Sequence, residues 1–395
     1  MTAFSIIPAS RTDLPTSPYA GHHFINGKVQ PSEDGKTFER VSPSHGVVVS
    51  VSALGGEADT LAAIKAARAA FDSGIWSRIS GKERAAVLLN IADLIEQNVE
   101  RMALLETLES GKPISQSRGE VSGSADLWRY AAALARTIHG DSHNTLGSDM
   151  LGVILKEPAG VVSVITPWNF PFWILSQKLP FALAAGCTCV VKPSEMTPST
   201  TAILGELLPQ AGLPDGVVNI VLGYGQPVGA LMASHPDVDM VTFTGSTAVG
   251  KAISAAASGT LKKVALELGG KNPQVIFPDA DLESAADAVT FGIYFNAGEC
   301  CNSGSRIIVH QDIAEDFVAR VVALSAQVPF GDPLDPRTQV GAIISTAHQG
   351  KIDAYVKEAE AAGATVRMGG SGFSVPGLGG QFYQPTVVSN VRPDM

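Results

Sequence analysis

The stretch Gly160-Val-Val-Ser-Val-Ile-Thr-Pro-Trp-Asn-Phe-Pro-Phe172 decides the fold. It places a short apolar, mostly β-branched run before a proline-fixed turn and a helical pattern over 172–185. The same order recurs downstream, with apolar runs over 188–191, 217–222, 240–243 and 263–266 and helical patterns over 198–208, 229–234 and 248–257. Such alternation predicts βαβ units in a parallel sheet that helices cover on both faces.

The carboxyl ends of these strands define where a ligand is expected. Right-handed crossovers bring them to one edge of the sheet, and open α/β sheets bind ligands at that edge. The candidate positions are therefore the residues that follow each strand, namely Pro167–Asn169, Lys192–Glu195, Gly223–Gly225, Thr244–Ser246 and Glu267–Gly270.

Simpler patterns flank this region. Asn26-Gly27 between apolar residues predicts a hairpin, and helices are expected over 59–71, 82–110 and 122–139, the last with Trp128 and Tyr130 in the core. Residues 140–158 suggest a hairpin or an edge ribbon. A second α/β block is expected from Lys271, with strands over 274–277 and 307–309 and helices over 282–295, 313–326 and 349–362.

Composition excludes several classes of protein. The 395 residues include 28 Lys and Arg against 38 Asp and Glu, a net charge of −10, and 45% are hydrophobic. An acidic globular chain without a basic block is a poor partner for nucleic acid or an anionic membrane. Four cysteines cannot form a disulfide framework, and neither a signal peptide nor a membrane-spanning run is evident. We expect a cytoplasmic protein without a metal site.

Two glycine-rich turns could hold phosphate. Gly223–Gly229 reads GxGxxxG, one residue longer than the dinucleotide fingerprint, so an ordinary βα turn is the simpler interpretation. Gly245–Lys251 resembles a P-loop, which gives a rival hypothesis of a nucleoside-triphosphate module. Ala252 argues against it, because no hydroxyl is present for Mg²⁺.

Other strand-end residues have two readings each. Lys192 and Glu195 could form hydrogen bonds with ribose hydroxyls, or they could belong to the sequence that begins the next helix. Asn169 could stabilise an oxyanion or cap a helix. Glu267 lies between two leucines, where burial would raise its pKa toward that of a general base, although a solvent-facing strand residue fits as well.

The cysteines divide into two pairs. Cys187 and Cys189 alternate along an apolar strand and are expected in the core. Cys300 and Cys301 lie between glycines in a polar loop, where an accessible thiol can act as a nucleophile. No spacing of Cys or His residues suggests a metal site.

Five segments together resemble the NAD(P)-dependent aldehyde dehydrogenase superfamily: Pro167-Trp-Asn-Phe-Pro, Lys192-Pro-Ser-Glu, Phe243-Thr-Gly-Ser, Leu266-Glu-Leu-Gly-Gly-Lys and Gly298-Glu-Cys-Cys. The resemblance implies an α/β, aldehyde dehydrogenase-like fold with a Rossmann-type NAD-binding domain of residues 1–139 and 159–270. It also implies an oligomerisation ribbon over 140–158 whose partner strand is missing, and an incomplete catalytic domain over 271–395.

The resemblance assigns the catalytic roles to three residues. Cys301 would attack the aldehyde carbon to form a thiohemiacetal, and Asn169 with the Cys301 N–H would hold the oxyanion. Oxidation would leave a thioester, and Glu267 would activate the water that releases the carboxylic acid. Glu267 also separates the chain from the similar CoA-acylating branch.

It assigns the remaining positions to cofactor and substrate. Lys192 and Glu195 would bind the adenosine ribose, Ser246 the pyrophosphate and Gly225 the adenine side, with Trp168, Gly245 and Leu268 completing the cofactor site. Glu195 favours NAD, although NADP is possible. The substrate, a small-molecule aldehyde, would meet Phe170, Trp173, Gln177, Phe295 and Cys300. An aromatic tunnel with a polar insert suits amino-aldehydes or betaine aldehyde as well as aliphatic ones.

Two departures from the family pattern matter. Position 299 is Glu where Gln is usual. Family members continue about one hundred residues beyond Met395, so we expect a truncated chain that forms a homodimer or homotetramer when full length. An alternative is therefore a non-catalytic or inactive truncated aldehyde dehydrogenase-like protein.

Overall fold

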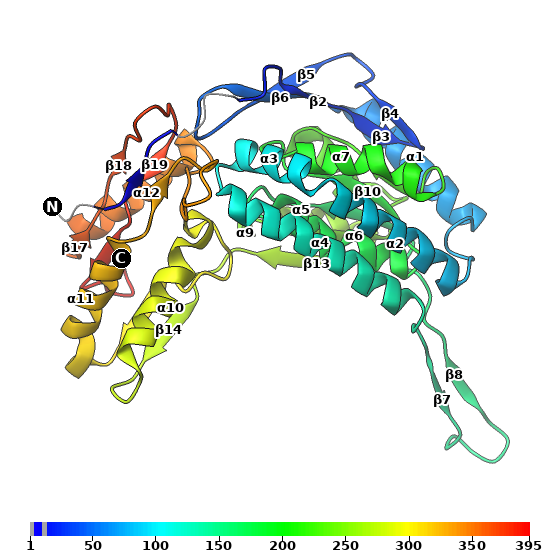
Figure 1. Cartoon of the computed structure of the whole chain (residues 1–395). Coiled ribbons are helices and arrows are strands. Elements are labelled where there is room, and N and C mark those ends of the chain that lie inside the picture. Colours follow the sequence, from blue (N-terminus) through cyan, green and yellow to red (C-terminus); the bar gives the residue numbers. More distant parts are fainter. Residues whose placement is uncertain (1–3, 10–13) are drawn as a thin grey trace.

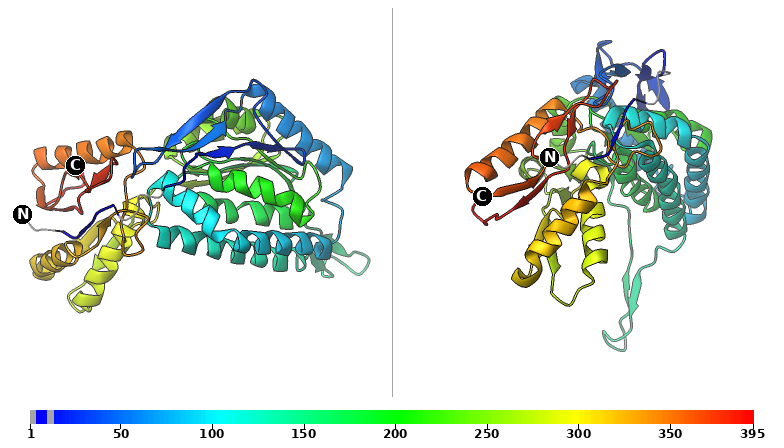
Figure 2. Two further views of the ribbon diagram at one scale, coloured as in Figure 1. Left: turned by 45° about the horizontal axis from the view of Figure 1, so that its top comes forward. Right: turned by 60° about the vertical axis from the view of Figure 1, so that its left-hand side comes forward.

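The computed structural model describes residues 4–9 and 14–395. Two α/β blocks lie side by side, and a thin two-stranded ribbon projects from the larger block (Figure 1). The larger block contains the central sheet, and the smaller one contains the C-terminal end of the chain, as Figure 2 shows from two further directions.

The central sheet has seven strands in the order β13-β12-β9-β10-β11-β3-β4. The first five are parallel to one another, which confirms the predicted parallel sheet. They are β13 (Lys263–Leu268), β12 (Met240–Gly245), β9 (Val161–Ile165), β10 (Thr188–Lys192) and β11 (Val218–Ile220).

The predicted hairpin extends this sheet. β3 (His23–Ile25) and β4 (Lys28–Gln30) pair antiparallel around Asn26 and Gly27, whose φ angles of 49° and 77° suit a tight turn. β3 then pairs antiparallel with β11. Local pattern predicts the hairpin, but this long-range pairing cannot be read from it.

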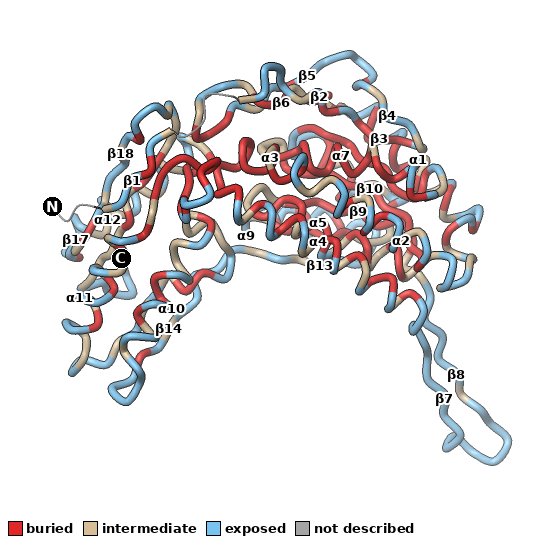
Figure 3. The backbone as a smooth tube through the Cα atoms, viewed as in Figure 1, coloured by how far each residue is buried: buried red, intermediate tan, exposed pale blue. Residues whose placement is uncertain are grey.

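Each face of the sheet has its own hydrophobic core, because alternate residues of each strand point to opposite faces. Val162 and Val164 pack with α2 (Gly81–Gln97), α3 (Val99–Ser110), α4 (Ile114–Ala135), α5 (Pro171–Ser176), α6 (Leu179–Ala184) and α7 (Ser199–Leu207). Val161 and Ile165 pack with α1 (Glu57–Ser73), α8 (Ala230–Ser234) and α9 (Thr247–Ser258). Helices thus cover both faces of the inner strands, and every residue of β9, β10 and β11 is buried (Figure 3).

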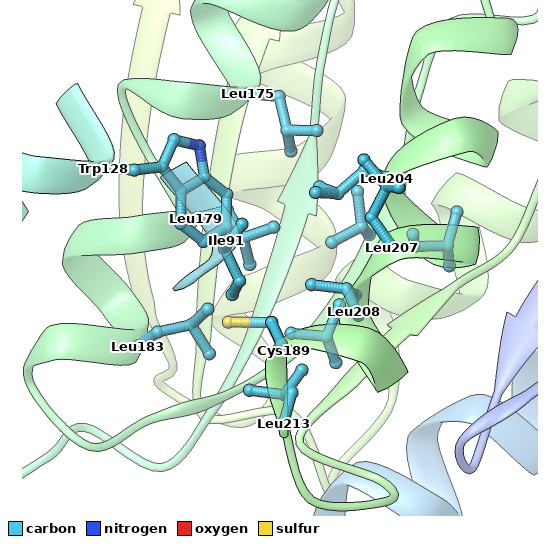
Figure 4. Packing of buried hydrophobic residues seen from close by; sticks show 14 of the residues in the cluster. Ile91, Trp128, Leu175, Leu179, Leu183, Cys189, Leu204, Leu207, Leu208 and Leu213 are labelled. Atoms are coloured by element: carbon cyan, nitrogen blue, oxygen red, sulfur yellow. The ribbon is translucent and has the colours of Figure 1, made fainter. Parts of the chain in front are cut away.

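The larger core contains the predicted buried cysteines. Cys189 lies among leucines of α6, α7 and the following segment, close to Ile91 and Trp128 (Figure 4). Burial raises the pKa of both Cys187 and Cys189, so these thiols are packing groups, as expected.

Three local predictions are wrong. The pattern over 82–110 is two helices, because the chain turns at Asn98, whose side-chain amide donates to the Leu94 carbonyl at 2.8 Å. The pattern over 172–185 breaks likewise between α5 and α6, at Gln177. Tyr130 is 58% exposed although Trp128 of the same helix is buried, because only one side of α4 faces the core.

The second block is small. β14 (Pro273–Ile276) and β15 (Arg306–Val309) pair in parallel and carry α10 (Leu282–Tyr294) and α11 (Ala314–Ser325). The chain continues through β16 (Phe330–Gly331), α12 (Thr346–Ala361), β17 (Thr365–Met368), β18 (Gly372–Phe373), β19 (Phe382–Tyr383) and β20 (Val387–Ser389). β1 (Ile6–Ile7) pairs with β16, so this N-terminal strand lies in the second block, whereas the sequence prediction placed residues 1–139 in the first.

The two blocks meet through backbone hydrogen bonds. Ile114 N–H donates to the Pro333 carbonyl at 2.8 Å, and Ala342 N–H donates to the Gly111 carbonyl at 3.1 Å. A third link comes from Arg40, on β5 (Thr37–Val41), which forms a three-stranded sheet with β6 (Val48–Ala53) and β2 (Tyr19–Gly21). Its guanidinium donates to the carbonyls of Glu109 and Ile344.

The ribbon consists of β7 (Asp141–His143) and β8 (Gly152–Ile154), which pair antiparallel. Its apolar side chains Leu151, Val153 and Leu155 are all exposed. Across the described part of the chain, every helix is too short or too polar to cross a membrane.

Candidate active site

Most of the predicted site residues lie together at the carboxyl edge of the central sheet. Glu267 and Leu268 end β13, Gly245 ends β12, Trp168 and Asn169 follow β9, and Lys192 ends β10. The strand register places Gly245 beside Leu268 and Lys192 beside Ile165. Residues that are far apart in the sequence therefore share one edge.

The two cysteines lie in a loop that approaches this edge from the second block. After α10 the chain passes through Asn296, Ala297 and Gly298, whose φ angles are 50°, 56° and 75°. This left-handed turn reverses the chain and leads into Cys300 and Cys301. Cys301 is exposed and Cys300 half-buried, and the Cys300 thiol donates to Asn302 Oδ1 at 2.8 Å. The predicted accessible thiol is thus present at Cys301.

Two asparagines tie this loop to the sheet edge. Asn169 Nδ2 donates to the Glu299 carbonyl at 2.8 Å. Asn296 is buried, and its Nδ2 donates to the Asn169 carbonyl at 3.0 Å and the Glu299 carbonyl at 3.3 Å. The side-chain amide predicted to hold an oxyanion is therefore next to the cysteine loop, and one of its two N–H groups remains for a ligand.

Glu267 is close enough to Cys301 to act on its ionisation. Although Cys301 is exposed, partial burial of its thiol raises the pKa, and Cys300 and the Glu267 carboxylate raise it further. Glu267 itself is exposed. The expectation that neighbouring leucines desolvate Glu267 is wrong, because β13 is an edge strand and leaves this side chain in solvent.

A second carboxyl group near the cysteine is buried. Burial raises the pKa of Glu299 to about 8. Its Oε1 accepts a hydrogen bond from Ile344 N–H at 3.1 Å and lies 3.7 Å from His348 Nε2. Burial also lowers the pKa of His348, whose ring contacts Trp168 edge to face at 5.4 Å between centroids. The sequence signalled this position only through Glu replacing the usual Gln.

Lys192 and Glu195 form a pair at the end of β10. The Lys192 ammonium is buried and donates to the Pro193 carbonyl at 2.9 Å and to Glu195 Oε2 at 3.5 Å. Burial lowers the pKa of Lys192. The carboxylate of Glu195 is partly exposed, so this pair presents a donor and an acceptor at the sheet edge.

A helix begins at the end of β12. Ser246 is the N-cap of α9, and its hydroxyl accepts from Val249 N–H at 3.3 Å. Gly250 packs so tightly on Leu268 that an added Cβ would lie 2.7 Å from Leu268 Cδ2. The start of α9 is therefore fixed against β13, with free backbone N–H groups that favour an anion.

The other glycine turn is open. Gly225 begins a short helical turn, Gly225–Gly229, and an added Cβ there would meet no atom within 4 Å. Gly229 lies against the Lys192 side chain, since a Cβ added to this glycine would be 3.5 Å from Lys192 Cδ. The turn thus adjoins the Lys192–Glu195 pair. In contrast, Lys251 is exposed within α9.

A cavity of about 400 Å³ adjoins the cysteine loop. It is lined by Gln116, Gly119, Glu120, Phe170, Trp173 and Phe295. Three of these are the predicted aromatic residues, whereas Gln177 is exposed and lies outside the lining. The three residues of α4 were missed, although their i, i+3, i+4 spacing marks one helix face.

Comparison with known proteins agrees with this arrangement. The model of the aldehyde dehydrogenase family matches residues 29–395. The chain belongs to the aldehyde dehydrogenase family. Among solved structures, an NAD-dependent aldehyde dehydrogenase from Sinorhizobium meliloti is 47% identical with a TM-score of 0.95, covering 99% of this chain and 78% of that one.

Other aldehyde dehydrogenases are nearly as similar. A betaine aldehyde dehydrogenase from Bacillus subtilis is 41% identical over 94% of this chain and 76% of its own length. The betaine aldehyde dehydrogenase of Staphylococcus aureus, solved in complex with NAD⁺, is 39% identical with a TM-score of 0.92, covering 95% of this chain and 75% of that one. These matches support aldehyde oxidation as the general chemistry, rather than the triphosphate-binding or non-catalytic alternatives.

Proposed function

We propose that this chain catalyses the NAD-dependent oxidation of an aldehyde to a carboxylic acid, with Cys301 as the nucleophile. The observation that supports this most is an exposed thiol, Cys301, whose ionisation is influenced by the Glu267 carboxylate and whose loop is tied to the sheet edge by the Asn169 amide. These are the nucleophile, base and oxyanion donor that acyl chemistry requires.

The first step uses Cys301 and Asn169. Because the pKa of the Cys301 thiol is raised, the thiol needs a proton acceptor, and the nearby Glu267 carboxylate is suited to that role. The thiolate adds to the aldehyde carbon and forms a thiohemiacetal. Asn169 Nδ2 donates a hydrogen bond to the oxygen that becomes negative in this step.

The cofactor site fits a dinucleotide by the chemistry of its donors. Lys192 and Glu195 offer a donor and an acceptor for ribose hydroxyls, and Ser246 with the N-terminus of α9 offers N–H and O–H groups for phosphate. Gly225, Trp168, Gly245 and Leu268 would complete this site. NAD, when bound, supplies the oxidant of the reaction. Glu195 would disfavour a 2′-phosphate by charge repulsion, which favours NAD over NADP.

The last step releases the acid. Oxidation of the thiohemiacetal leaves a thioester on Cys301, and a water molecule must attack it. Glu267 is exposed to solvent on the edge strand, and its charge acts on the Cys301 thiol. We assign it the removal of a proton from this water, which returns the free thiol.

The test compares the two adjacent cysteines. NADH formation from NAD and a panel of aldehydes is followed by absorbance for the wild type, Cys301→Ser and Cys300→Ser. We expect Cys301→Ser to lose activity by about a thousandfold or more while still showing an NAD-dependent rise in melting temperature. Cys300→Ser should keep most of its activity. An active Cys301→Ser variant, or a wild type that oxidises no aldehyde, would refute the proposal.

A further inference from the structure

A buried histidine lies against the start of the open glycine turn. His23, the first residue of β3, is fully buried. Its Nδ1 accepts a hydrogen bond from Leu222 N–H at 3.1 Å. Leu222 follows the end of β11 and directly precedes Gly223, where the turn over 223–229 begins. A side chain of the N-terminal hairpin therefore holds the last residue before this turn.

The other backbone group of Leu222 is fixed as well. Its carbonyl accepts from Gly55 N–H at 2.8 Å. The packing here is close, because a Cβ added to Gly55 would lie 2.5 Å from the Leu222 carbonyl oxygen and 3.2 Å from His23 Cε1. Gly223 has a φ angle of 146°, and a Cβ added to it would lie 3.1 Å from the Gly55 carbonyl oxygen. The start of the turn is thus enclosed between His23 and Gly55.

The hydrogen bond to Leu222 also fixes the tautomer of the His23 ring. Nδ1 must be unprotonated to accept it, so the proton of the neutral imidazole is on Nε2. Burial lowers the pKa of His23 to about 4, against the opposing effect of the Asp59 carboxylate, so the ring is neutral near pH 7. Nε2 faces Asp59 Oδ1 at 4.0 Å and has no hydrogen-bond partner among the described residues. Asp59 is itself held by the N–H groups of Glu33 and Gly56, each at 2.9 Å.

The position of the turn depends on this acceptor. Leu222 is fully buried, so without Nδ1 its N–H would be buried and unpaired, a state that costs free energy and that a shift of the backbone would relieve. Such a shift would pass to Gly223, which follows directly, and along the turn to Gly229, which lies against the Lys192 side chain. His23 therefore acts on the cofactor edge through the backbone.

We propose that His23 is a positioning residue of the cofactor site, and that its hydrogen bond to Leu222 N–H fixes the turn over 223–229 for the adenosine end of NAD. The inference rests on the proposed function, in which Gly225 and Lys192 belong to the cofactor site. His23 is fully buried, so it acts through the turn and leaves the contacts with NAD to other residues. A turn that is already fixed binds its ligand more tightly, because less conformational entropy is lost on binding.

The test measures the binding of NAD and of AMP, which carries the adenosine half of the cofactor, by calorimetry. His23→Leu removes the acceptor, and we expect it to weaken the binding of both ligands by about tenfold, the effect of about one hydrogen bond. His23→Asn places an amide oxygen near the position of Nδ1 and should bind both ligands within about threefold of the wild type. His23→Gln carries the same amide one carbon farther out and should resemble His23→Leu.

Ile91→Val is the control for a loss of stability without a change at the turn. Ile91 is buried in α2, in the hydrophobic core on the face of the sheet opposite to α1. The loss of one methyl group there lowers the unfolding free energy, which urea unfolding measures, but should leave both affinities unchanged. In the aldehyde assay, His23→Leu should raise KM for NAD and keep kcat within about twofold of the wild type.

Three results would overturn the inference. They are an unchanged affinity for NAD in His23→Leu, a loss in His23→Asn as large as that in His23→Leu, and an equal loss in Ile91→Val. If the His23 variants do not fold, the wild type supplies the test, because nitrogen NMR of protein labelled at histidine shows which ring nitrogen carries the proton. We expect the proton of His23 on Nε2, and a proton on Nδ1 would also overturn the inference.

The binding measurements do not depend on turnover, so they separate this inference from the proposed function. If the variants bind NAD and AMP as expected but no aldehyde is oxidised, the proposed function fails and the inference stands. If aldehydes are oxidised and His23→Leu binds NAD like the wild type, the inference alone fails. A wild-type protein that binds no NAD would refute both.

Discussion

Glu299 and Glu106 are buried carboxyl groups whose pKa values are both raised by burial to about 8. A carboxyl group with a raised pKa holds its proton in the folded state and loses it in the unfolded state above its ordinary value of about 4.5. Its contribution to stability is therefore fully present below about pH 4.5 and is lost as the pH rises through about 8.

This gives a prediction for Glu299→Gln. The glutamine amide oxygen can still accept from Ile344 N–H, but it has no proton to lose. We expect the unfolding free energy of the variant to fall less than that of the wild type between pH 5 and pH 9. The difference should reach about 2 kcal/mol, from about 1.4 kcal/mol per pKa unit reduced for relaxation on ionisation. Urea unfolding at several pH values measures it.

Glu360→Gln is the control for this series. Glu360 is exposed on α12, so the loss of its charge should leave the pH dependence of the wild type unchanged. If the unfolding free energy changed with pH in the same way for Glu299→Gln and the wild type, burial would not keep Glu299 protonated.

At the scale of elements, sequence patterns predicted the parts whose signal is local. The apolar runs of β9, β10 and β12 and the Asn26-Gly27 hairpin appear as expected. The helix break at Asn98 was missed, because the apolar periodicity of α2 continues into α3 and one side-chain hydrogen bond decides the turn.

Some features of the candidate site could likewise be predicted from local sequence, and others could not. Asn169, which follows β9, could be named from a short motif, since parallel strands share one edge. Cys301 could be named from the motif of the loop that carries it. The cavity beside the cysteine loop could not, because its lining depends on α4 lying beside Phe170 and Trp173. The exposure of Glu267 also follows from strand order, which places β13 at the end of the sheet and which no local pattern contains.

The ribbon is a two-stranded element with exposed apolar side chains. Leu151 and Leu155 are 69% and 74% exposed on a two-stranded element that would be marginal by itself. We expect it to pack against a second copy of the chain in a homodimer or homotetramer. Leu151→Glu with Leu155→Glu should shift the protein to a smaller species in size-exclusion chromatography with light scattering.

The control for the ribbon introduces a carboxylate at an exposed apolar residue elsewhere on the surface. Tyr355→Glu introduces a carboxylate at an exposed apolar residue of α12 and should leave the assembly unchanged. A wild-type protein that is monomeric at all concentrations would contradict the prediction.

At the scale of the whole molecule, the catalytic loop depends on how the two blocks meet. Glu299 is held by Ile344 N–H, and the Ile344 carbonyl is held by Arg40 from the first block. Two residues earlier, Ala342 N–H donates to the Gly111 carbonyl. The segment 342–344 therefore connects the end of α3 with the loop that carries Cys301.

Gly341 is the point where this junction is closest. A Cβ added there would lie 1.8 Å from the Gly111 carbonyl oxygen, so the backbone must move to accept any side chain. We expect Gly341→Ala to lower the unfolding free energy by about 2 kcal/mol, as overpacking does, and to reduce kcat several-fold. NAD affinity should change by less than about twofold, because the proposed cofactor residues Lys192 and Ser246 lie wholly on the first block.

Gly350→Ala is the matched variant in the same block. Gly350 lies in α12, where an added Cβ would meet no atom within 4 Å, and alanine in a helix is favoured over glycine by up to about 1 kcal/mol. Chemical unfolding, steady-state kinetics and NAD titration of both variants separate the effects. If Gly341→Ala lost NAD affinity and kcat in equal measure, the damage would extend into the first block. The junction would then not act on the cysteine loop through residues 342–344.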